Sequence, residues 1–186
     1  ESELIPSRRF PLRTMAFLLF LADCMQDPFV SILANRLYTP ILGIPQSVGA
    51  ALPLSAQVLC AALSAFACGS IIRKTGAKRM LTIGFIIQMA GFVLCGALMQ
   101  YMGLLIGKMV IGIGIGALLV SLNSIAAAGR NENETAEAFT AVNAGTLAGI
   151  TVGAGVGALL MYVSDFSMVY YVSALILVIG LLMSVF

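Results

Sequence analysis

The amino-acid sequence predicts an all-α membrane protein with six transmembrane helices packed as one bundle. Hydrophobic residues make up 60% of the 186 residues and charged residues only 10%, whereas a soluble domain has roughly 45–50% and about 25%. The apolar residues lie in long blocks, and a helix needs ~20 apolar residues to cross a bilayer. The sequence lacks the alternation of polar and apolar residues that is typical of a membrane β-strand. These observations favour membrane-spanning helices.

Six apolar blocks define the expected helices, and the short connections between them indicate one compact domain, 12–186. The blocks cover residues 12–33, 44–72, 80–99, 103–127, 136–163 and 168–186. The second and fifth blocks exceed ~20 residues, so these helices should tilt or protrude. Residues 1–11 are expected to form a cytoplasmic N-terminal segment. Because the chain begins at Glu1 and ends inside an apolar block, we expect it to be a piece of a longer polypeptide.

Basic residues gather on one side of the expected membrane. Between the second and third blocks, a tight turn that Gly76 permits carries four of them: Arg73, Lys74, Lys78 and Arg79. The basic residues of the N-terminal segment and Arg130 fall on the same side, and the five tyrosines map to the opposite boundary. Loops rich in lysine and arginine stay in the cytoplasm. The N-terminus and loop 73–79 are therefore expected in the cytoplasm of a plasma-membrane protein, which in a bacterium means the inner membrane.

Three ionisable residues lie inside the apolar blocks: Asp23, Asp27 and Lys108. A charge at mid-bilayer costs ~2.5–3.5 kcal/mol or more, so such residues usually face the bundle interior or a wet cavity. Asp27 follows Asp23 by one helical turn on the same face, and two neighbouring carboxylates repel each other, which favours a proton on one of them. Asp27 and Lys108 come to similar depths and could pair. A structural ion pair and a role in substrate binding or proton coupling are both open interpretations.

Other polar residues within the blocks point mainly to contacts between helices. Gln57, Gln88, Asn123 and Asn143 are more often interhelical hydrogen-bond partners than ligand contacts. The four cysteines, of which Cys24 is the first, all fall in apolar blocks, and we interpret them as buried hydrophobes rather than disulfides or metal ligands. Neither a metal site nor an organic cofactor is expected.

The sequence does not predict an enzyme or a nucleic-acid-binding protein. The chain has no histidine, which removes the commonest general base, and it lacks a nucleophile–base set and a phosphate-binding loop. The basic cluster around Gly76 is short and has no aromatic neighbours, so membrane topology explains it better than nucleic acid does.

Small residues recur at intervals of four in three of the blocks. The fifth block carries Gly145, Gly149, Gly153 and Gly157, the fourth carries Gly112 and Gly116, and the second carries Ala61, Ala65 and Gly69. Helices in lipid associate through close contact at small residues. Packing is the simplest interpretation. The alternative is that smooth helix faces slide or rock during a transport cycle.

Several motifs make the sequence resemble the amino-terminal six-helix half of a major facilitator superfamily transporter. The loop pattern G-x-L-a-D-r-x-G-r-k is matched by Gly69, Ile71, Lys74, Gly76 and Lys78, although Arg73 replaces its aspartate and Ala77 an arginine that is often present. The pattern l-x-x-x-R-x-x-x-G-x-G is matched by Leu104, Gly112 and Gly114, with Lys108 at the arginine. Gly145, Gly149 and Gly153 match the fifth-helix motif, with Ile150 in place of the proline typical of drug/proton antiporters. The stretch from Asp23 to Pro28 is similar to an acid-to-proline pattern in the first helix.

The resemblance implies secondary transport of a small solute by alternating access, with H⁺ or Na⁺ as coupling ion and a second six-helix half, in the same polypeptide or a partner chain. It also implies that the first and fourth helices line the central cavity, which places Asp23, Asp27, Lys108 and Asn123 on the substrate or proton pathway. Residues Gly69 to Arg79 would belong to a cytoplasmic gate. The alternative function is a non-transporting, transporter-like membrane module that anchors or relays signals for a fused domain.

Overall fold

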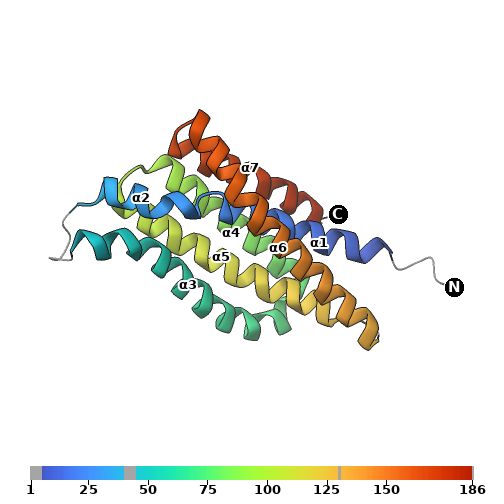
Figure 1. Cartoon of the computed structure of the whole chain (residues 1–186). Coiled ribbons are helices and arrows are strands. Elements are labelled where there is room, and N and C mark those ends of the chain that lie inside the picture. The colour runs from blue at the N-terminus through green and yellow to red at the C-terminus, as the bar shows by residue number, and fades with distance from the viewer. Residues whose placement is uncertain (1–5, 40–44, 130, 186) are drawn as a thin grey trace.

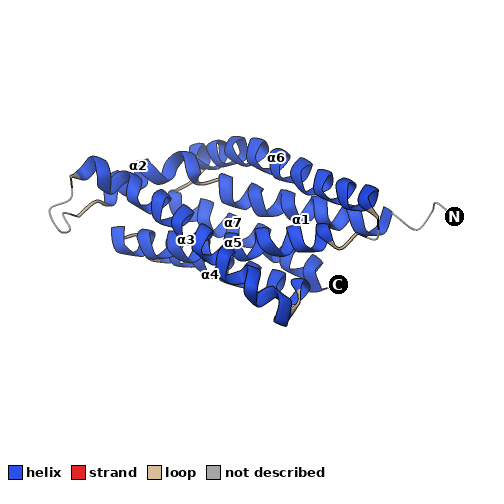
Figure 2. Cartoon of the chain, turned by 90° about the horizontal axis from the view of Figure 1, so that it is seen from below, coloured by secondary structure: helices blue, strands red, loops and turns tan. Residues whose placement is uncertain are grey.

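The computed structural model describes residues 6–39, 45–129 and 131–185, and within them the chain forms seven α-helices and no strand (Figures 1 and 2). The helices are α1 (Pro6–Cys24), α2 (Asp27–Leu37), α3 (Gln46–Thr75), α4 (Ala77–Ala97), α5 (Tyr101–Ala127), α6 (Glu132–Val163) and α7 (Phe166–Val185). Helices α1 and α2 follow each other as one membrane-spanning unit, so the described chain has six helical units long and apolar enough to cross a membrane.

The expected blocks and the observed helices agree except at some boundaries. The helix begins at Pro6, so the expected N-terminal segment 1–11 is helical in its second half. Residues 1–5, Arg130 and Phe186, to which some expectations refer, lie outside the described residues, as does the expected start of the second span. The first span was expected to be one helix, and this expectation was wrong.

The first span is interrupted at Met25 and Gln26. Proline has no N–H, so Pro28 cannot donate the helical hydrogen bond to the carbonyl of Cys24, and α1 ends there. The N–H groups of Phe29 and Val30 instead bond to the carbonyl of Gln26, at 2.9 and 3.1 Å. Because proline is well accepted in the first turn of a helix, α2 starts at once. The break therefore lies inside the membrane span.

The six spanning units run side by side, and the start of α1 and the end of α7 lie at the same end of the bundle (Figure 1). Helix α5 is the most enclosed unit: 61% of its most apolar stretch is buried. Helices α3 and α6 are the least enclosed, with 22% and 17% buried. Large apolar side chains such as Phe66 on α3 and Leu159 on α6 are exposed, as is expected for surfaces that face lipid or another membrane domain.

A regular ladder of glycines joins α6 to α1. A Cβ atom built on Gly149 would lie 2.6 Å from the carbonyl oxygen of Phe17, and one on Gly153 would lie 2.8 Å from that of Leu21. Gly145 and Gly157 meet the carbonyls of Arg13 and Met25 in the same way. Glycines and carbonyls both recur every four residues, so the two helices run parallel with their backbones in contact. Any side chain in the ladder would separate them.

Glycines also hold α5 against both of its neighbours. Gly112 and Gly116 lie against the carbonyls of Gln57 and Ala61 on α3, whereas Gly114, on the opposite side of α5, lies against the backbone of Gln88 on α4. Ser64 reinforces the α3 contact because its hydroxyl donates to the carbonyl of Ile113 at 2.7 Å. The α5 helix is thus fixed between α3 and α4.

Gly69 was expected to continue a small-residue stripe on α3 and to belong to the gating loop, and its role in gating stays a prediction. It lies inside α3, and a Cβ atom built on it would have no neighbour within 4 Å among the described residues. Gly76 is the single residue between α3 and α4, and its φ of 87° is one that favours glycine. The four basic side chains around Gly76 are exposed.

Candidate coupling site

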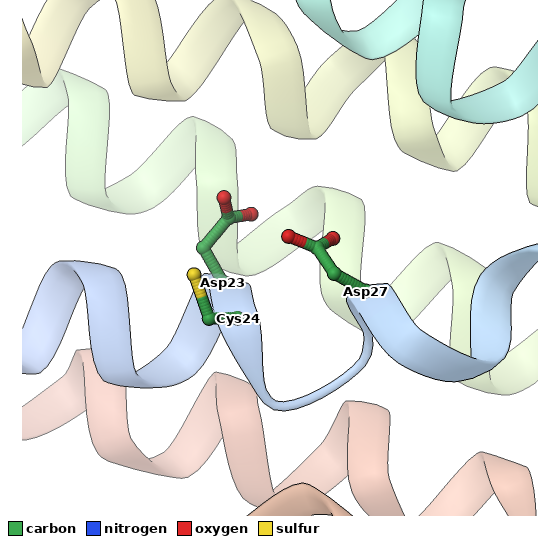
Figure 3. A group of neighbouring side chains, drawn as sticks. All are labelled: Asp23, Cys24 and Asp27. Atoms are coloured by element: carbon green, nitrogen blue, oxygen red, sulfur yellow. The ribbon is translucent and has the colours of Figure 1, made fainter. Parts of the chain in front are cut away.

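The break in the first span places two carboxylates beside each other. Asp23 lies in the last turn of α1, and Asp27 is the first residue of α2. Ligand atoms of Asp23, Cys24 and Asp27 lie within 4.8 Å of one another. Both carboxylates point away from the connecting turn (Figure 3). The continuous helix on which the sequence analysis based this proximity is absent, but the proximity itself is present.

Lys108 reaches this site from α5. Its side chain is fully buried, and its Nζ lies 3.5 Å from Oδ1 of Asp27, whose side chain is 39% exposed. The distance is at the long end for a hydrogen bond between charged groups. The ion pair that similar depths suggested is therefore present.

Gln57 joins the site from α3. Its Nε2 donates to Oδ1 of Asp23 at 3.1 Å, while its Oε1 is buried and has no hydrogen-bond partner among the described residues. The side chains of Gln57 and Asp23 are 5% and 8% exposed. A buried acceptor without a partner costs about 1–3 kcal/mol. The sequence indicated that Gln57 bonds between helices but could not name its partner, which lies 34 residues away.

The site carries an unbalanced charge. With all three groups ionised, the two carboxylates and the Lys108 ammonium leave one net negative charge in a mostly buried cluster. Desolvation makes such a charge expensive unless it is compensated. One additional positive charge, as a bound proton or a monovalent cation, would make the cluster neutral.

The helix ends at the break act differently on the two carboxylates. Asp27 in the first turn of α2 is favoured by the partial positive charge of a helix N-terminus. Asp23 lies near the C-terminus of α1, where the partial charge is negative and the last four carbonyls lack partners within the helix. The Asp23 side of the break is thus the side that attracts a cation.

Asn123 does not belong to this cluster. It lies fifteen positions after Lys108 on the same helix, which is about 22 Å along the axis at 1.5 Å per residue. Its side chain is exposed on α5. The expectation that Asn123 lines the substrate or proton pathway stays a prediction, independent of the cluster at Asp23.

Gln88 was expected to hydrogen-bond between helices, but among the described side chains neither of its amide atoms has a partner. It is fully buried on α4 and packs against Gly114, on the side of α5 opposite Gly112 and Gln57. Gln88 and Gln57 are therefore buried glutamines on opposite sides of one helix.

Comparison with known proteins decides the family. A sequence profile described as Major Facilitator Superfamily matches residues 15–186, which is most of the chain. The chain belongs to the Major Facilitator Superfamily. None of the curated proteins compared with it matches. Its six spans form an all-α membrane bundle of the kind that makes up half of a transporter in this superfamily, and the protein is a multi-pass membrane protein of a transporter family that handles small solutes.

Proposed function

We propose that this superfamily member is part of a secondary active transporter that moves a small solute by alternating access, coupled to one cation that enters at Asp23, Asp27 and Lys108. The observation that carries the proposal is the pair of carboxylates, Asp23 and Asp27, that shares the single ammonium of Lys108 beside a break in a membrane-spanning helix. Such intramembrane charges usually mark ion or substrate pathways. The chemistry is binding and release, without a covalent catalytic step.

The proposed arrangement requires a second six-helix half, in the same polypeptide or in a partner chain. The exposed apolar surfaces of α3 and α6 leave room for such a neighbour. In secondary transporters, substrate and coupling ions bind near the bilayer midplane between repeats, and rocking of one bundle against the other exposes the site to each side in turn.

The proposed orientation places the start of α1 and the turn at Gly76 in the cytoplasm, with the plasma membrane, or bacterial inner membrane, as the location. The four exposed basic side chains around Gly76 support it through the positive-inside rule. In this orientation the turn at Gly76 and its basic residues form part of the cytoplasmic gate, and the helix break lies near the middle of the first span, Leu12–Leu37.

The test is solute-driven cation uptake by the full-length protein in liposomes. Amino acids, sugars and organic cations are added one at a time, while a trapped pH-sensitive dye reports H⁺ and ²²Na⁺ reports sodium. We expect at least one solute to drive uptake of one of these cations, and Asp23→Asn and Asp27→Asn to abolish the coupling. Equal cation movement in the wild type and both variants would contradict the proposed role of the cluster.

A further inference from the structure

We propose that the helix break between α1 and α2 forms a binding site for one sodium ion, with the carboxylates of Asp23 and Asp27 and Oε1 of Gln57 as its side-chain ligands. This inference rests on the proposed function and specifies the coupling ion that the function leaves open. It goes beyond charge compensation, because a proton and a sodium ion make different demands on the oxygen atoms at the site.

The amide of Gln57 distinguishes the two ions. Its Nε2 already donates to Asp23, and its Oε1 has no partner among the described groups. A proton on Asp23 could reach Oε1 only if the amide turned over, and Nε2 would then lose its acceptor. A sodium ion accepts Oε1 as a ligand while Nε2 continues to donate to Asp23. Of these two ions, sodium is the one that satisfies both ends of this buried amide without turning it over.

The spacing of the carboxylates fits one hard cation. Ligand atoms of Asp23 and Asp27 lie within 4.8 Å of each other. Oxygen ligands lie roughly 2.3–2.6 Å from a hard cation such as Ca²⁺, so two oxygens on one ion of similar size can be up to about 5 Å apart. Pro28 cannot donate the helical hydrogen bond to the carbonyl of Cys24, and carbonyls freed by helix breaks coordinate Na⁺ in membrane transporters.

Lys108 sets the valence of the bound ion. Its ammonium engages Asp27 at 3.5 Å and reduces the charge of the cluster to one net negative unit. A monovalent cation makes the site neutral, whereas a divalent cation would leave a net positive charge in a buried position. The thiol of Cys24, which is a soft ligand, adds little to the binding of a hard cation.

The experiment measures ²²Na⁺ binding to the full-length protein in detergent by scintillation proximity, with choline chloride keeping the ionic strength constant. It needs no knowledge of the solute. We expect saturable binding of one Na⁺ per chain, and loss of binding in Asp23→Asn. Gln57→Leu should weaken binding at least about tenfold, the lower limit seen when even an outer-shell partner of a metal site is removed.

Gln88→Leu is the matched control, because it removes another buried glutamine amide on the opposite side of α5. It should keep the wild-type affinity for Na⁺, and thermal unfolding of each variant shows whether it is folded. Wild-type protein without saturable Na⁺ binding, or equal loss of affinity in Gln57→Leu and Gln88→Leu, would overturn the sodium site. Solute-driven H⁺ uptake in the liposome assay would then still support the proposed function.

Discussion

The two sides of α1 differ in how completely their polar groups find partners within the bundle. On one side, the carbonyls of Phe17, Leu21 and Met25 lie directly against glycines of α6. On the other side, two positions and about 200° from both Leu21 and Met25, Asp23 faces an amide with an unpartnered oxygen. The glycine side is a closed contact with no polar side chain, and the Asp23 side is a polar cluster that lacks one positive charge.

This difference indicates that the two sides of α1 have different roles in the bundle. Close-packed backbones have few alternative arrangements, so α1 and α6 are expected to move as one unit. The Asp23 side can change its charge without disturbing that contact. A cation that enters or leaves at the break would therefore change the electrostatics between α1, α3 and α5 while the α1–α6 pair stays intact.

The largest expected effect comes from Lys108→Ala, which breaks the polar side of this comparison. Removing one partner of a buried ion pair costs about 3–5 kcal/mol, and the 39% exposure of Asp27 places the expected loss at the low end. Solute-driven cation uptake and the unfolding midpoint in detergent should both fall. Lys108→Arg keeps the charge and should retain more activity.

The double variant Lys108→Ala with Asp27→Asn provides the control for that effect. It removes both charges of the pair and leaves Asp23 alone with its one negative charge, so the unfolding midpoint should recover toward the wild-type value. Equal activity of the Lys108→Ala and Lys108→Arg variants would show that the pair has no role.

A smaller effect is expected from Gly149→Ala, which breaks the glycine side. The added Cβ would lie 2.6 Å from the carbonyl oxygen of Phe17, and overpacking of this kind costs about 1–3 kcal/mol. Gly155→Ala is the matched control on the same helix, because a Cβ there meets no described atom within 4 Å. The unfolding midpoint of Gly155→Ala should stay the same or rise, since alanine is a better helix former than glycine. If Gly149→Ala were as stable as Gly155→Ala, the ladder would not be a close contact.

The sequence predicted the glycine side better than the polar side, and the reason is physical. A four-residue repeat fixes which residues share a helix face, so the small face of α6 follows from Gly145 to Gly157 alone. Which face of another helix meets it depends on the tertiary arrangement. The pairing of Gly149 with the backbone of Phe17 could not be predicted for that reason.

The break in the first span is marked in the sequence by Pro28. Proline is tolerated within transmembrane helices, so Pro28 alone did not indicate a complete interruption of the helix. The full interruption depends on the carbonyl of Gln26 accepting two N–H groups, a local choice that composition does not reveal. Likewise, nothing in the sequence distinguished Gln57 from Gln88. Only the meeting of α1 and α3 gives one glutamine a carboxylate partner and leaves the other with none among the described residues.

The next prediction concerns the turn between α3 and α4, where we expect a loss of stability no larger than that of Gly149→Ala. Gly76 has a φ of 87° and a ψ of 146°, a conformation that only glycine adopts readily, so Gly76→Ala should cost about 1–3 kcal/mol through backbone strain. Gly69→Ala, in open space inside α3, provides the control and should leave the unfolding midpoint unchanged or raise it. A comparison of the two midpoints in detergent tests whether the conformation of the turn, rather than any loss of glycine, matters. Equal midpoints would contradict the strained turn.

The smallest effect is expected from Asn123→Ala, which tests how far the polar side extends. Asn123 is exposed, its amide carries no charge, and it lies about 22 Å from Lys108 along α5. Substitution of an exposed residue usually changes stability by less than about 0.5 kcal/mol. The affinity for ²²Na⁺ should therefore equal that of the wild type. A loss of affinity comparable to that of Gln57→Leu would mean that the cation site reaches along α5, and the contrast between a compact polar cluster and a glycine ladder would no longer describe the bundle.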